Sequence, residues 1–91
     1  MIPAPVMTKK VVIEFGNIVW DIPGWVDTTT VKINQMVNEG KTDGIPYGLP
    51  GESVSIRHFT DLGSAEEWID FITELNVTLG RGIISTKISD L

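Results

Sequence analysis

The sequence predicts an α+β domain in which two helices cover one face of an antiparallel sheet. Three observations predict this class. Strand, helix and strand patterns follow one another twice, apolar and polar residues alternate within the strand segments, and glycines and prolines separate the segments. Two such units in tandem give the order βαββαβ, which as a split βαβ pair forms the ferredoxin-like sandwich. We expect one domain over residues 9–91 after a loose leader at residues 1–8.

The first predicted strand covers residues 9–15, where apolar side chains alternate with others. Two interpretations of the next segment stay open. Gly16-Asn17 can form a two-residue hairpin loop that leads into an extra strand over residues 18–22. Alternatively, the first strand ends near Phe15 and the chain runs irregularly along an edge until Pro23-Gly24 stops it.

A helix is predicted to begin with Asp27 as its cap and to run to about Glu39. Its apolar face would hold Val26, Thr30, Ile33, Met36 and Val37. Threonines and β-branched residues weaken this helix, so a strand within residues 28–39 is an alternative. Trp20 and Trp25 precede the helix, and they belong either to the core or to an exposed aromatic patch.

Glycine and proline dominate residues 40–51, which predicts loops and turns. A short strand over residues 43–47 is expected there, and Pro46 confines it to a sheet edge because proline cannot donate a ladder hydrogen bond. The next strand follows from about Ser53, and the last begins at Ile83. We expect one set of strand residues to face the helices: Val11, Ile13, Phe15, Val54, Ile56, Ile84 and Ile88. Another set should face away from them: Glu14, Ser55, Arg57, Ser85 and Lys87.

The second helix shows the clearest signals in the chain. Ser64 is a suitable N-cap and Glu67 completes a capping-box pattern. Trp68 is the predicted main anchor of a stripe of apolar residues at helical spacing: Ala65, Trp68, Ile69, Ile72, Leu75 and Leu79. Gly80 and Gly82 end the helix.

Composition excludes several classes of function. The net charge is −5, with most acidic residues in the second half of the chain, and no basic stripe points to nucleic acid or anionic membranes as partners. The chain has no cysteine, which excludes disulfides, thiolate metal sites and cysteine nucleophiles. No apolar run reaches the roughly 20 residues of a membrane span, and the first residues do not resemble a secretory signal, so a cytoplasmic location is expected.

His58 is the single histidine. We interpret it as a hydrogen-bonded structural residue at a strand end, because one imidazole makes a poor metal set and neither a metal nor a cofactor is indicated. The alternative is a catalytic proton-transfer residue next to Tyr47 or Asp61.

Glu14, Arg57 and Lys87 form a second candidate site, since the alternation pattern places all three on the open face of neighbouring strands. Solvated charges or ion pairs across a dimer interface are the simpler interpretation. The functional alternative is a small anionic ligand that Arg57 holds inside a dimer cavity.

The closing segment resembles small ferredoxin-like proteins of the dimeric α+β barrel kind. The resemblance lies in residues 56–71 and 83–88, where a strand ending His-Phe leads through a short turn into an amphipathic helix with a tryptophan. The chain is also similar to short marine phage proteins, in the Gly-Lys-Thr-Asp-Gly of residues 40–44 ahead of residues 59–68. The barrel resemblance implies a dimer whose sheets face each other, and some such proteins oxidise small molecules in the enclosed cavity.

The leading functional hypothesis is therefore a non-enzymatic structural or protein-interaction domain that forms a homodimer. The first alternative is a dimeric α+β barrel that binds or oxidises a small ligand between its sheets. The second is a phage-type accessory or virion protein.

Overall fold

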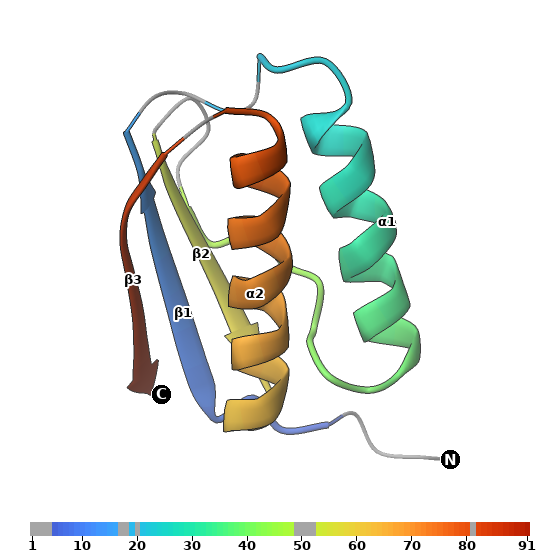
Figure 1. Cartoon of the computed structure of the whole chain (residues 1–91). Coiled ribbons are helices and arrows are strands. Elements are labelled where there is room, and N and C mark those ends of the chain that lie inside the picture. The colour runs from blue at the N-terminus through green and yellow to red at the C-terminus, as the bar shows by residue number, and fades with distance from the viewer. Residues whose placement is uncertain (1–4, 17–18, 20, 49–52, 81) are drawn as a thin grey trace.

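Three strands and two helices make up the part of the chain that the computed structural model describes, which is residues 5–16, 19, 21–48, 53–80 and 82–91. In chain order they are β1 (Lys9–Phe15), α1 (Trp25–Asn38), β2 (Val54–Phe59), α2 (Leu62–Thr78) and β3 (Ile83–Asp90). The strands form one antiparallel sheet in the order β2-β1-β3. Both helices lie on the same face of this sheet (Figure 1). The predicted α+β class is confirmed.

The core lies between the central strand and the helices. Val11, Ile13 and Phe15 of β1 are buried on the covered face of the sheet. Helix α2 contacts all three strands and contributes Ala65, Trp68 and Ile72 to the core, whereas α1 contributes Trp25, Ile33 and Met36. The Trp25 ring meets the Phe15 ring edge to face, with 5.8 Å between centroids, so Trp25 belongs to the core.

Both edges of β1 are occupied, which decides against the hairpin, one of the two interpretations left open for this segment. Ile13 lies opposite Ser55 of β2 and Thr86 of β3, so no edge of β1 is free for a further strand. Asn17, Ile18 and Trp20, which the hairpin interpretation would involve, lie outside the described residues. Val19 is buried in the core at 1% exposure, a position that the alternation pattern did not predict.

Helix α1 confirms the helical interpretation of this segment, but its start and its buried face differ from the prediction. The helix begins two residues before Asp27, after Gly24, whose left-handed φ of 84° provides the entry without a side-chain cap. The buried stripe is Trp25, Thr29, Ile33 and Met36. The large Trp25 ring sets this face, and the Thr29 hydroxyl is satisfied by donating to the Trp25 carbonyl at 2.9 Å.

The expected strand over residues 43–47 is not formed. Thr42 makes one isolated antiparallel bridge to Phe59, and the Tyr47 N–H donates to the Ile56 carbonyl at 3.0 Å. Between them, Gly44 has a φ of 74°, which is incompatible with a regular strand. This segment therefore runs beside β2 as an irregular edge, and the described sheet has three strands instead of four.

The predicted orientation of β2 is wrong by one residue. Residues directly opposite each other in an antiparallel pair share a face, and Arg57 lies opposite buried Val11 while Ile56 lies opposite Val12. Arg57 and Ser55 thus face the helices, and Val54 and Ile56 face away from them. The reason is Phe59, which is fully buried and carries every second residue of the strand inward with it.

A bulge explains the second difference in facing residues. The register shifts between Glu14 and Phe15, so that Glu14 pairs with Ser85 and Phe15 pairs with Ile83. Ile84 is the extra residue and is 65% exposed, instead of facing the helices as predicted. Ile83 and Ile88 both pack against the core on either side of it.

Helix α2 begins earlier than predicted because Asp61, not Ser64, is its cap. The Asp61 carboxylate accepts a hydrogen bond from the Ser64 N–H at 2.7 Å, which leaves Ser64 buried inside the first turn. Along the helix, Ala65, Trp68 and Ile72 are buried as expected, and Ile69 and Leu75 pack against the core. Among the described residues, neither helix is long and apolar enough to cross a bilayer.

Candidate functional site

The structure separates Arg57 from the two charges that were expected to accompany it. Arg57 lies on the helix-covered face, where its guanidinium carbon is 5.7 Å from the centre of the Trp68 ring. It donates a hydrogen bond to the Gly44 carbonyl at 3.1 Å. Burial lowers the pKa of Arg57, and Asp43 opposes that effect. Glu14 and Lys87 lie on the opposite face, so the three residues do not form one site.

The uncovered side of the sheet carries a small grid of side chains, which we call the outer face. It has three rows across the strands: His58, Lys10 and Ser89; Ile56, Val12 and Lys87; Val54, Glu14 and Ser85. The apolar members lie at the centre of the grid and along β2. Val12, Val54 and Ile56 are half-buried although both described helices lie on the other face of the sheet (Figure 1). An apolar centre surrounded by polar side chains is typical of an interaction surface.

A stacked pair of aromatic rings lies at the β2 edge of the outer face. The rings of Tyr47 and His58 lie 3.8 Å apart at 17°, and the Tyr47 hydroxyl donates to the Asp43 carboxylate at 2.6 Å. This hydrogen bond raises the pKa of Tyr47, because a phenolate could not donate it and would be repelled by Asp43. The predicted neighbourhood of His58 and Tyr47 is therefore present, with Asp43 as the third member.

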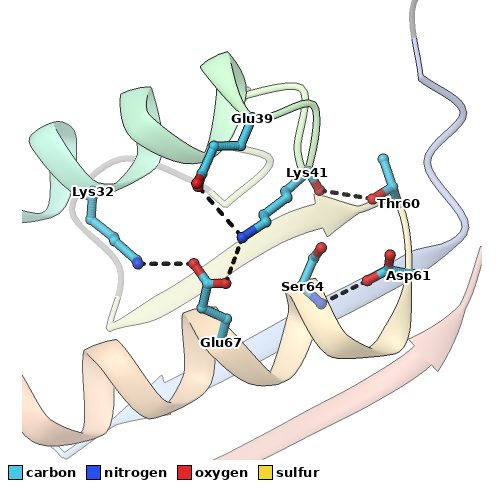
Figure 2. Close-up of polar contacts among 7 residues, drawn as sticks. All are labelled: Lys32, Glu39, Lys41, Thr60, Asp61, Ser64 and Glu67. Carbon is cyan, nitrogen blue, oxygen red and sulfur yellow. Dashed lines mark hydrogen bonds and ion pairs between the residues drawn. The ribbon is translucent and has the colours of Figure 1, made fainter.

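Asp61, the other expected partner of His58, has a different role. Its carboxylate accepts the hydrogen bond of Ser64 at the start of α2 (Figure 2). That backbone hydrogen bond is the main cause that lowers the pKa of Asp61. The carboxylate is therefore held ionised as a helix cap, and such a group is a poor proton-transfer residue near neutral pH.

A second polar cluster joins the two helices on the covered side of the sheet. Glu67 accepts hydrogen bonds from Lys32 of α1 and from Lys41, each at 2.9 Å, and Lys41 is also 3.5 Å from Glu39 (Figure 2). The bonds from Lys41 and then Lys32 lower the pKa of Glu67. Each charge in this cluster has an opposite partner, which indicates a structural role in joining α1 to α2.

The described residues hold no cluster of possible metal ligands at these groups. An open groove of about 280 Å³ lies elsewhere, between the helices, and is lined by Thr28, Val31, Lys32, Gln35 and Phe71. Within the described part of the chain, no three His, Asp or Glu side chains lie close enough to hold a metal ion. The outer face with its Tyr47–His58 stack is thus the strongest candidate site for an interaction.

Sequence reasoning missed the apolar centre of the outer face and one buried amide. Asn76 is 1% exposed and accepts the indole N–H of Trp25 at 3.1 Å, which links α2 to the start of α1. The sequence carries no signal for this pair, since asparagine is usually exposed. For the outer face, the available signal was Phe59: placing it inside would have turned Val54 and Ile56 outward.

Comparisons with protein-family models, curated proteins and solved structures each found no match.

Proposed function

We propose that this chain is a non-enzymatic interaction domain that forms a homodimer through its outer face. The observation that carries the proposal is the apolar centre formed by Val12, Val54 and Ile56 on the sheet face opposite the two described helices (Figure 1). We choose a second copy of the chain as the partner, because a two-fold dimer uses the same surface patch on both subunits. One self-complementary patch is therefore sufficient.

We further propose that the fold is a ferredoxin-like sandwich with a degenerate edge strand. The sheet order β2-β1-β3 corresponds to three adjacent strands of that fold. The segment from Thr42 to Tyr47 lies beside β2, where the remaining strand would be, and it keeps one bridge and one backbone hydrogen bond to β2. This arrangement supports the sequence resemblance to dimeric α+β barrel proteins, in which sheets pack face to face.

The size of the outer face sets the expected affinity. Four chains at about 4.8 Å spacing and six residues at about 3.3 Å give a projected area of roughly 400 Å². Two copies would then bury about 800 Å², which is below the roughly 1,200 Å² of stable specific interfaces and in the range of weak, transient ones. We therefore expect a dimer with a dissociation constant in the micromolar range, which corresponds to a binding free energy of roughly −8 kcal/mol.

Analytical ultracentrifugation from about 5 to 500 µM tests this proposal, because the range brackets a micromolar constant. Val12→Asp places a charge at the centre of the outer face and should leave only monomer. Val12→Thr keeps the β-branched shape and should weaken the dimer without affecting the fold. The matched control is Val31→Asp on α1, where the wild-type side chain is 69% exposed; it should dimerise normally. Monomeric wild-type protein at the highest concentration would refute the proposal.

The stacked rings support a second candidate function, the binding of a small ligand between two sheets. Tyr47 is 42% exposed, so an aromatic molecule could extend the Tyr47–His58 stack at the margin of the dimer. Arg57 does not take part, since it lies on the covered face. Phenol can serve as an NMR probe: we expect it to shift His58 resonances in the wild type and not in Tyr47→Leu. Equal shifts in both proteins would exclude this site.

A further inference from the structure

The positions of two opposite charges on β1 bear on how two copies face each other. Lys10 and Glu14 stand two residues before and two residues after Val12, on the outer face of the central strand. Each is therefore about 6.6 Å from Val12 along the strand. Val12 is the central residue of the three-by-three grid, so these charges are placed symmetrically about its midpoint.

Two closed arrangements with aligned strands bring one outer face onto another. In both, the two-fold axis lies between the sheets and passes Val12. If the axis runs along the strands, Lys10 meets Lys10 of the second copy, Glu14 meets Glu14, and the β2 column lies on the β3 column. Ile56 is then covered by Lys87. Like charges meet twice, and an apolar side chain is buried against a cation, which disfavours this arrangement.

If the axis runs across the strands, the order of residues along each strand is reversed in the second copy. Lys10 then meets Glu14 twice, once on each side of the axis, and Ile56 meets Ile56 in the middle row. Val54 lies on His58, beside the Tyr47 ring. Lys87 is the one charge that meets its own copy, but it is exposed on the edge strand β3, where its long side chain can direct the ammonium into water.

We infer that the outer face forms a two-fold dimer whose axis crosses the strands at Val12, with Lys10 of each copy paired to Glu14 of the other. This inference rests on the proposed homodimer and adds the orientation of its copies. The geometry permits it: facing sheets lie about 10 Å apart, a gap that lysine and glutamate side chains can bridge from both sides. A rotation of about 30° between the sheets moves residues 6.6 Å from the axis by only about 3 Å.

Charge reversal tests the orientation. Lys10→Glu and Glu14→Lys each convert two attractive pairs into two repulsive ones, so each variant should weaken the dimer about 10-fold or more. The double variant Lys10→Glu/Glu14→Lys restores both pairs in the opposite sense and should return the dissociation constant to within about 3-fold of the wild type. Sedimentation at several concentrations measures all four proteins, and circular dichroism confirms that each is folded.

The Glu14→Lys variant also separates this pairing from general charge repulsion. It adds two positive units to a net charge of −5, which gives −3 and should favour association if only net charge matters. The inferred pairing predicts weaker association instead. Glu74→Lys on the exposed surface of α2 makes the same change in net charge away from the sheet, and it should not weaken the dimer.

The possible failures are distinguishable. If the wild type is monomeric, or if Val12→Asp dimerises normally, the proposed use of the outer face fails and this inference fails with it. If Val12→Asp is monomeric but both single reversals dimerise like the wild type, the outer face is the interface and the orientation is wrong. An unrestored double variant likewise overturns the orientation alone.

Discussion

Trp68→Ala is the substitution that tests the core most directly. Trp68 is 1% exposed, with the rings of Phe59 and Phe71 at 6.2 and 6.0 Å between centroids and the Arg57 guanidinium at 5.7 Å. Truncating such an aromatic costs about 3–5 kcal/mol. A domain of this size has about 5–14 kcal/mol of stability in total. The variant should therefore lose about a fifth or more of its free energy of unfolding.

Urea unfolding followed by circular dichroism measures this loss. With a slope near 1.5 kcal/mol per molar urea, the midpoint should fall by about 2–3 M. An unchanged midpoint would contradict the central position of Trp68 and with it the packing of α2 on the sheet. A fall in slope rather than midpoint would indicate a change in the unfolded or native ensemble, so both parameters are needed.

Trp68→Phe provides the matched control. The Trp68 indole N–H is buried and has no hydrogen-bond acceptor among the described residues, and leaving such a donor unpaired costs about 1–3 kcal/mol. Phenylalanine removes the unpaired donor, which should raise the free energy of unfolding, and it leaves a small cavity, which should lower it. We expect the free energy of unfolding to stay within about 1 kcal/mol of the wild type. A loss as large as that of the alanine variant would refute this reasoning.

Two further predictions concern the covered side of the sheet. Gly44→Ala should destabilise the fold by at least about 1–2 kcal/mol, because φ is 74° and a Cβ there would lie 2.7 Å from Val37 Cγ2; a higher melting temperature would contradict this. The pKa of Glu67 is lower in the folded protein than its ordinary value of 4.5. The carboxylate should therefore stabilise the fold fully at pH values above 4.5, and this stabilisation should be lost as the pH falls through the lower pKa of the folded state. Glu67→Gln should therefore cost about 1 kcal/mol near pH 7 and less at pH 3, as measured by urea unfolding at both pH values; an equal cost at both would exclude the ion pairs as its cause.

Elements with strong local signals were predictable from the sequence. β1 has three apolar residues at alternate positions, and its observed bounds equal the predicted ones. The stripe that contains Ala65, Trp68 and Ile72 identified α2 and its buried face. Helix starts were less predictable, because Gly24 and Asp61 took the terminal positions ahead of the expected caps at Asp27 and Ser64. Several residues can cap within one turn, and packing selects among them.

The candidate site was predicted only in part. Tyr47 and His58 do lie together, but Arg57 was placed on the wrong face and Asp61 serves α2. In β2 both faces carry an apolar residue, so alternation alone allows two orientations of the strand. A shift of one residue exchanges all of its side chains between the faces. The same ambiguity hid the bulge at Ile84, which changes the phase of β3 part of the way along the strand.

By itself, the sequence determined the α+β class, the central strand, the helical nature and inner face of α2, and the absence of thiol chemistry, because these depend on local periodicity and composition. Tertiary structure alone decided which face of β2 turns inward. Phe59 packs beside Trp68 and brings Arg57 with it, because burying a large ring outweighs the cost of covering an arginine whose guanidinium still contacts an aromatic face and a carbonyl. That choice turned Val54 and Ile56 toward the uncovered side and thereby created the outer face.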